Sequence, residues 1–147
     1  MESSSKPLPF FFVGQALVNQ RTADFVNQKN NLLSEALGKP DTRSIWYSRD
    51  HIAGLLDEID HAGGDGLRIA FGMYERGHQF AGQLCLMMNP TRGVAVGDSV
   101  VHQAVILENE PDFAERSAVN KDYDFGNGLP GVDKGFNLGS PCPPICD

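Results

Sequence analysis

Two histidine–carboxylate spacings in the first half of the chain could support acid–base chemistry. Asp57 and His61 are four residues apart in a segment with helical periodicity, so their side chains are neighbours on the helix surface. A carboxylate in this position can orient a histidine that acts as a base or as a metal ligand, although exposed pairs more often contribute only a weak surface interaction. His51 and Glu58 lie two turns apart, about 10 Å along the helix axis, so we expect no catalytic metal on this helix.

Cys142 and Cys146 are the one close cysteine pair, and they leave three interpretations open. A zinc site usually needs four ligands from two close pairs, and the further candidates are His78 and His102. A redox motif has two residues between its cysteines, whereas this pair has three. The pair is therefore a reduced structural tail, a local disulfide, or a zinc site, which two chains could share. No other cofactor is expected, and Cys85, in an apolar run, is expected to be a buried, inert thiol.

Four oxygen-bearing residues near the C-terminus resemble part of a calcium loop: Asp122, Asp124, Asn127 and Asp133. Gly126 stands where that loop needs an oxygen ligand, so a series of turns is the better interpretation. The sequence contains no phosphate-binding loop, nucleophile elbow or zinc-protease motif. Sequence motifs therefore indicate no particular reaction.

The charge distribution excludes two classes of partner. The chain has 147 residues and a formal net charge of −7, and residues 108–147 carry eight acidic and three basic side chains, a net charge of −5. A nucleic-acid-binding protein needs a basic stripe to displace counterions from phosphates, and an anionic membrane surface would repel this chain. No apolar run approaches the ~20 residues of a membrane span. We expect no nucleic acid, no membrane and a cytoplasmic location.

Hydrophobic periodicity predicts the elements that must position these residues. A helix is expected over residues 15–37, ended by Gly38, and an amphipathic helix over residues 49–62, with Ser48 as its N-cap. Short apolar or alternating runs predict strands, and they comprise residues 44–47, 67–74, 83–88 (ended by Asn89 and Pro90) and 100–107, the last with a helix as the alternative. Residues 111–119 are expected to hold a helical turn. The short connection between 67–74 and 83–88 predicts antiparallel neighbours.

These elements predict an α+β fold, in which two helices cover a short antiparallel sheet. We expect a flexible arm over residues 1–13, a folded domain over 14–121 and an extended Gly/Pro-rich tail over 122–147. Matching periodicities predict one buried core, formed by Leu55, Ile59, Leu67, Ile69, Phe71, Leu84 and Leu86.

Three blocks of the sequence resemble a known group of proteins. They are Ser44-Ile-Trp-Tyr-Ser48, Asp65-Gly-Leu-Arg-Ile-Ala-Phe-Gly72 and Cys142-Pro-Pro-Ile-Cys146. Together they are similar to small uncharacterised bacterial proteins with an S-I-W-Y…D-G-L-R-I-x-F-G core and a C-P-P-x-C tail. The resemblance implies no known activity and transfers no functional residue.

The function expected from these observations is that of a non-catalytic interaction or assembly module. Its acidic tail is too rich in apolar side chains for a plain linker, so a protein partner or self-association is expected through Tyr123, Phe125, Phe136 and Ile145. Two alternatives remain. One is a metal-binding protein that uses Cys142 and Cys146.

The other alternative is a small enzyme with a polar pocket on one face of the sheet, near Trp46, Tyr47, Arg68 and Tyr74. Arg68 lies between Leu67 and Ile69 and therefore points to the opposite face of the strand. There its guanidinium should stack on a tyrosine or tryptophan ring, or pair with a carboxylate such as Asp50.

Overall fold

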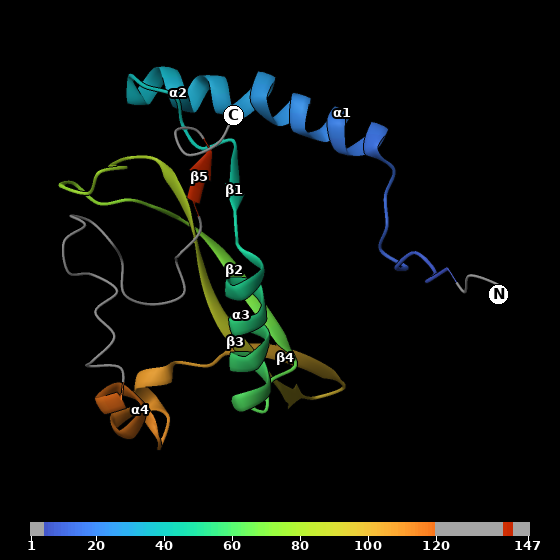
Figure 1. The fold of residues 1–147 in the computed structure, drawn as a ribbon, viewed down its shortest axis with the longest axis vertical. Helices are drawn as coiled ribbons and strands as arrows, with labels where there is room; N and C mark the ends of the chain where they lie inside the picture. The colour runs from blue at the N-terminus through green and yellow to red at the C-terminus, as the bar shows by residue number, and fades with distance from the viewer. Residues whose placement is uncertain (1–4, 120–139, 143–147) are drawn as a thin grey trace. The chain divides into compact units, whose positions relative to one another are not determined.

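The computed structural model describes residues 5–119 and 140–142 of the chain, which divides into two compact units, one of residues 1–40 and one that begins at Asp41. The first unit contains the predicted long helix, built from α1 (Gln15–Phe25), a π-helical turn η1 (Val26–Asn30) and α2 (Asn31–Leu37) (Figure 1). Gly38 ends it in the left-handed conformation, with φ of 77°, which glycine adopts without steric cost.

The second unit begins with a strand and the amphipathic helix. Strand β1 (Ser44–Trp46) leads to α3 (Arg49–His61), whose first turn is capped by Ser48. The Ser48 side chain accepts a hydrogen bond of 3.1 Å from the His51 backbone N–H, as expected for an N-cap serine. A separate antiparallel pair joins β1 to β5 (Ser140–Cys142), with Ser44 opposite Cys142.

A three-stranded antiparallel sheet in the order β2-β3-β4 forms the centre of this unit. Its strands are β2 (Gly66–Met73), β3 (Leu84–Val96) and β4 (Ser99–Ala104). In the register Ile69 lies opposite Met88, and Val94 lies opposite Val101. The predicted α+β class, the antiparallel pairing of the first two strands and the strand character of residues 100–104 are confirmed.

The predicted end of the middle strand at Asn89 and Pro90 is wrong, because β3 continues to Val96. Proline lacks the N–H that would bind β4, and the side chain of the residue before it compensates for its absence. The Pro90 carbonyl accepts from the Val105 N–H at 2.7 Å, and the Asn89 side-chain amide donates to the Val105 carbonyl at 3.3 Å. The Asn89 side chain thus donates to the Val105 carbonyl the hydrogen bond that the Pro90 backbone cannot donate.

The chain after β4 contains two short helical segments among the described residues. The predicted last strand ends early, since residues 107–109 form the 3-10 turn η2 (Leu107–Asn109). The expected helical turn over residues 111–119 is present as α4 (Phe113–Val119). No helix among the described residues is long and apolar enough to cross a membrane.

The predicted core is only partly correct. Five of its seven residues are half-buried, namely Leu55, Ile59, Leu67, Leu84 and Leu86. The other two are exposed, Ile69 to 50% and Phe71 to 80%. Arg92, on the same sheet face as these two, donates from Nε to the Ala62 carbonyl at 2.6 Å, so the C-terminal end of α3 lies over β3. Met88 and Pro90 of β3 are buried on that face, whereas the outer part of β2 is left uncovered.

Candidate functional site

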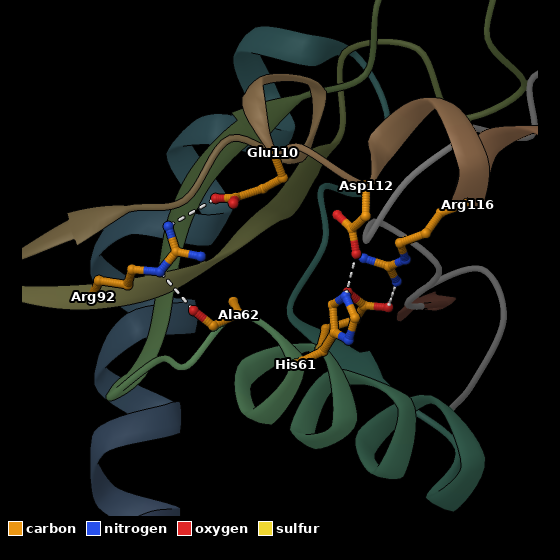
Figure 2. A network of polar contacts seen from close by, with 7 residues as sticks. His61, Ala62, Arg92, Glu110, Asp112 and Arg116 are labelled. Carbon is orange, nitrogen blue, oxygen red and sulfur yellow. Dashed lines mark hydrogen bonds and ion pairs between the residues drawn. The ribbon is translucent and has the colours of Figure 1, made fainter.

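A polar network holds the end of α3 against the segment that precedes and includes α4 (Figure 2). His61 Nε2 lies 2.6 Å from Asp112 Oδ2, and Arg116 donates to the Glu58 carboxylate. A second arginine, Arg92, contacts Glu110 at 2.8 Å as well as the Ala62 carbonyl. All of these side chains except that of Glu58 border a hollow of about 250 Å³.

The charged groups of this network pair mainly with one another, which indicates a structural role. The hydrogen bond from His61 is the main cause that lowers the pKa of Asp112 below its usual value. Glu58 raises the pKa of Arg116 in the same way. The helical spacing predicts Asp57, four residues earlier, as the partner of His61. In the structure the partner of His61 is Asp112, 51 residues later. The local spacing rule could not find a partner that distant.

A second polar cluster lies on β2, β3 and β4, on the sheet face opposite Ile69 and Phe71. Asp65 is its centre: Oδ1 accepts from Thr91 Oγ1 at 2.7 Å, and Oδ2 lies 2.5 Å from His102 Nδ1. Arg68 Nη2 donates to the His102 carbonyl at 2.8 Å. Together they line a shallow depression of about 360 Å³.

Gly93 makes the Asp65–His102 contact possible. It lies opposite His102 in the register of β3 and β4, between the aspartate and the histidine. A Cβ atom added at Gly93 would lie only 2.9 Å from Asp65 Oδ2. The carboxylate therefore occupies the space that any other residue at this position would fill, and it crosses β3 to reach His102.

The cluster has the geometry of a carboxylate-oriented histidine. With Nδ1 bonded to Asp65, the other ring nitrogen, Nε2, is the atom of His102 that could accept a proton from a substrate. The hydrogen bond from Thr91, and then that from His102, lower the pKa of Asp65, so this carboxylate is ionised at neutral pH. The His102 side chain is 64% exposed, and water therefore screens the pair.

The structure does not bring the residues of the predicted pocket, Trp46, Tyr47, Arg68 and Tyr74, together at one site. Arg68 and Tyr74 lie six residues apart along one strand direction, about 20 Å at ~3.3 Å per residue. Within the described part of the chain, Arg68 donates to the His102 backbone and pairs with neither Asp50 nor an aromatic ring, so these expected partners are wrong there. Trp46 is on β1 and is exposed.

The two tyrosines of that predicted pocket are partly or fully buried. Tyr74 is buried, and its ring stacks on His78 at 4.3 Å between centroids. Burial raises the pKa of the Tyr47 hydroxyl, and the nearby Cys85 raises it further. As expected, Cys85 is buried.

Strand β2 carries an apolar surface that no described residue covers. Ile69, Phe71 and Met73 are 50%, 80% and 70% exposed, and they point to one face of the sheet because they alternate along the strand. Directly after this strand, Tyr74 donates its N–H at 3.0 Å to the carbonyl of Gln83, the residue that precedes β3. Because main-chain groups also alternate along a strand, the N–H and C=O groups of the odd-numbered residues from Leu67 to Met73 face away from β3.

The remaining predicted site residues lie outside the described part of the chain. They are Tyr123, Phe125, Phe136, Ile145 and Cys146; only the backbone of Cys142 is described, in β5. Within the described residues, no group of three or more His, Cys, Asp or Glu side chains could hold a metal ion. The zinc interpretation of the cysteine pair thus stays a prediction.

Comparison of the chain with protein-family models, with curated proteins and with solved structures found no match. The function must therefore be argued from the side chains and surfaces described above.

Proposed function

We propose that this protein is a non-catalytic interaction or assembly module that docks an extended protein segment on strand β2. The observation that carries the proposal is the combination of three exposed apolar side chains, Ile69, Phe71 and Met73, with a main-chain edge on the same strand that no described strand pairs. Exposed edges of this kind are templates for an added strand, whose main-chain hydrogen bonds give affinity and whose side chains give specificity.

The way in which the chain covers the exposed part of β3 supports this proposal. The part of β3 that extends past β4 is covered by the chain itself, since Asp41 accepts from the Leu84 N–H at 2.9 Å and Thr42 donates to the Leu84 carbonyl at 2.8 Å. Proteins commonly protect edge strands by charges, prolines, bulges or covering segments. Between Leu67 and Met73, β2 carries a single charged residue, Arg68, and no proline.

The acidic C-terminal segment remains part of the proposal, because its apolar residues Tyr123, Phe125, Phe136 and Ile145 suit contact with the same partner. The proposal includes a cytoplasmic location, which the odd number of cysteines favours over an oxidising compartment. Nucleic acid and anionic membrane are not proposed as partners, because the net charge is −7.

A strand-shaped peptide tests the proposal directly. The probe is a fluorescent peptide with the sequence of residues 66–74, flanked by lysines for solubility, and fluorescence anisotropy measures its binding to dilute full-length chain. Phe71→Ser should weaken binding about tenfold or more, because burying a phenylalanine contributes roughly 1.5–3 kcal/mol. Val100→Ser is the matched control, since Val100 is 60% exposed on β4, and it should leave binding unchanged. Failure of the wild-type chain to bind the peptide would refute the proposal.

The Asp65–His102 pair favours a second candidate, a small enzyme in which His102 Nε2 is a general base in hydrolysis. The test is turnover of an activated ester such as 4-nitrophenyl acetate. His102→Gln should abolish hydrolysis, and Gly93→Ala should lower it because the new methyl group displaces Asp65 from His102. His61→Gln is the control, since His61 belongs to the other cluster, and an equal loss in this variant would exclude a specific role for His102.

A further inference from the structure

We propose that the segment that docks on β2 is the β2 strand of a second copy of this chain, so that two sheets join into one across a two-fold axis at Ala70. The inference rests on the proposed function, and it names the partner. Homodimeric interfaces of this type are isologous: the same patch meets itself, so the patch must be self-complementary under a two-fold rotation.

The pattern of β2 is self-complementary about Ala70. Counting outward from that residue, Ile69 and Phe71 are the first neighbours, and Leu67 and Met73 are the third neighbours, so all four apolar positions are related in pairs. The second neighbours are Arg68 and Gly72. A two-fold axis at Ala70 therefore places every apolar residue opposite another one.

Two antiparallel copies in this register give hydrogen-bond partners to the main-chain groups of β2 that face away from β3. Ile69 would lie opposite the second copy's Phe71, and Leu67 opposite its Met73. These odd-numbered residues are the ones whose N–H and C=O groups face away from β3. Each such pair exchanges two hydrogen bonds, which gives about eight main-chain hydrogen bonds across the axis.

The side chains fit the same register. Residues directly opposite one another in an antiparallel pair lie on the same face, and pairs of aromatic with β-branched residues are among the favourable ones. Phe71 and Ile69, at 80% and 50% exposure, would cover each other on the face where α3 lies over β3.

The charge of β2 is also compatible with this register. On the other face, Arg68 would lie opposite Gly72, so it faces no like charge. Because Gly72 has no side chain, the long arginine also has room there. Shifting the axis by one residue, to Phe71, would instead oppose Leu67 to Glu75.

Disulfide trapping tests the register. The full-length chain carries Ala70→Cys together with Cys142→Ser and Cys146→Ser, and Cys85, at 3% exposure, does not compete. In this register the two Ala70 residues form a non-hydrogen-bonded pair with Cα atoms about 4.5 Å apart, within disulfide reach. Mild oxidation should yield a covalent dimer. Arg68→Cys in the same background is the matched control, because the two Arg68 residues would lie four residues apart in register, about 13 Å, beyond the reach of a disulfide.

Sedimentation measures the association itself. The wild-type chain should form a dimer across a concentration series, Phe71→Pro should lose it because proline removes an outward-facing N–H, and Phe71→Ala should weaken it less. A monomer at every concentration with no trapped dimer would overturn the inference, as would a dimer that Arg68→Cys traps as well as Ala70→Cys. If a monomeric chain still bound the strand peptide, the interaction function would stand and only the identity of the partner would be wrong.

Discussion

Asp65 shows how a single side chain connects the three strands of the small sheet. It directly precedes β2, accepts from Thr91 on β3 and contacts His102 on β4. Gly93 leaves the space for this crossing. The contact between Asp65 and His102 therefore depends on both residues, the aspartate that makes it and the glycine that leaves room for it.

The pKa of Asp65 predicts how its contribution depends on pH. Hydrogen bonds lower this pKa in the folded state, so they stabilise the fold while the carboxylate is ionised, above the unfolded pKa of about 3.9. That stabilisation is lost as pH falls through the lower, folded-state pKa. Asp65→Asn should therefore lower the urea midpoint at pH 7, and the difference from wild type should shrink in acid.

Thr91→Val is the companion variant for this titration. It removes the hydrogen bond that contributes most to the lowered pKa, so the acid-dependent loss of stability should be smaller in Thr91→Val than in wild type and should be complete at a higher pH. An Asp65→Asn chain with the same urea midpoint as wild type at pH 7 would contradict this role of the carboxylate.

At the scale of elements, patterns within one segment were predictable and contacts between segments were not. The α3 helix follows from apolar spacing and Ser48, and the end of the long helix follows from Gly38, because each signal acts within a few residues. The sequence predicts too early an end for β3, at Asn89 and Pro90, because a proline normally ends a central strand. The compensating bond joins Asn89 to Val105, 16 residues away.

The same limit explains the errors in the core and in the candidate site. Alternation correctly placed Ile69 and Phe71 on one face of a strand, but it cannot tell whether another element covers that face. Histidine partners were missed for a similar reason, since His102 meets Asp65 only through the register of three strands. A glycine opposite a histidine in a predicted hairpin is the one sequence signal that could have suggested this contact.

At the scale of the second unit, ion pairs attach the segment of η2 and α4 to the rest. Arg92, Asp112 and Arg116 connect that segment to α3 and β3. The apolar contribution at this junction is limited, since Phe113 is 37% exposed and Ile106 is 51% exposed. Charged contacts therefore matter more here than in the sheet.

Removing Arg116 should loosen this attachment, because Glu58 would keep its half-buried carboxylate without a cation. Its second oxygen, Oε2, is buried without a hydrogen-bond partner among the described residues, so the carboxylate depends on the arginine. Arg116→Gln should destabilise the fold by about 1–2 kcal/mol in urea unfolding, at the low end for a charged group because Arg116 is one-third exposed. Adding Glu58→Gln to that variant should recover part of the loss, since the unpaired charge is then gone. Hydrogen exchange should localise the effect to residues 107–119, and a double variant no more stable than Arg116→Gln would show that the pair does not hold this segment.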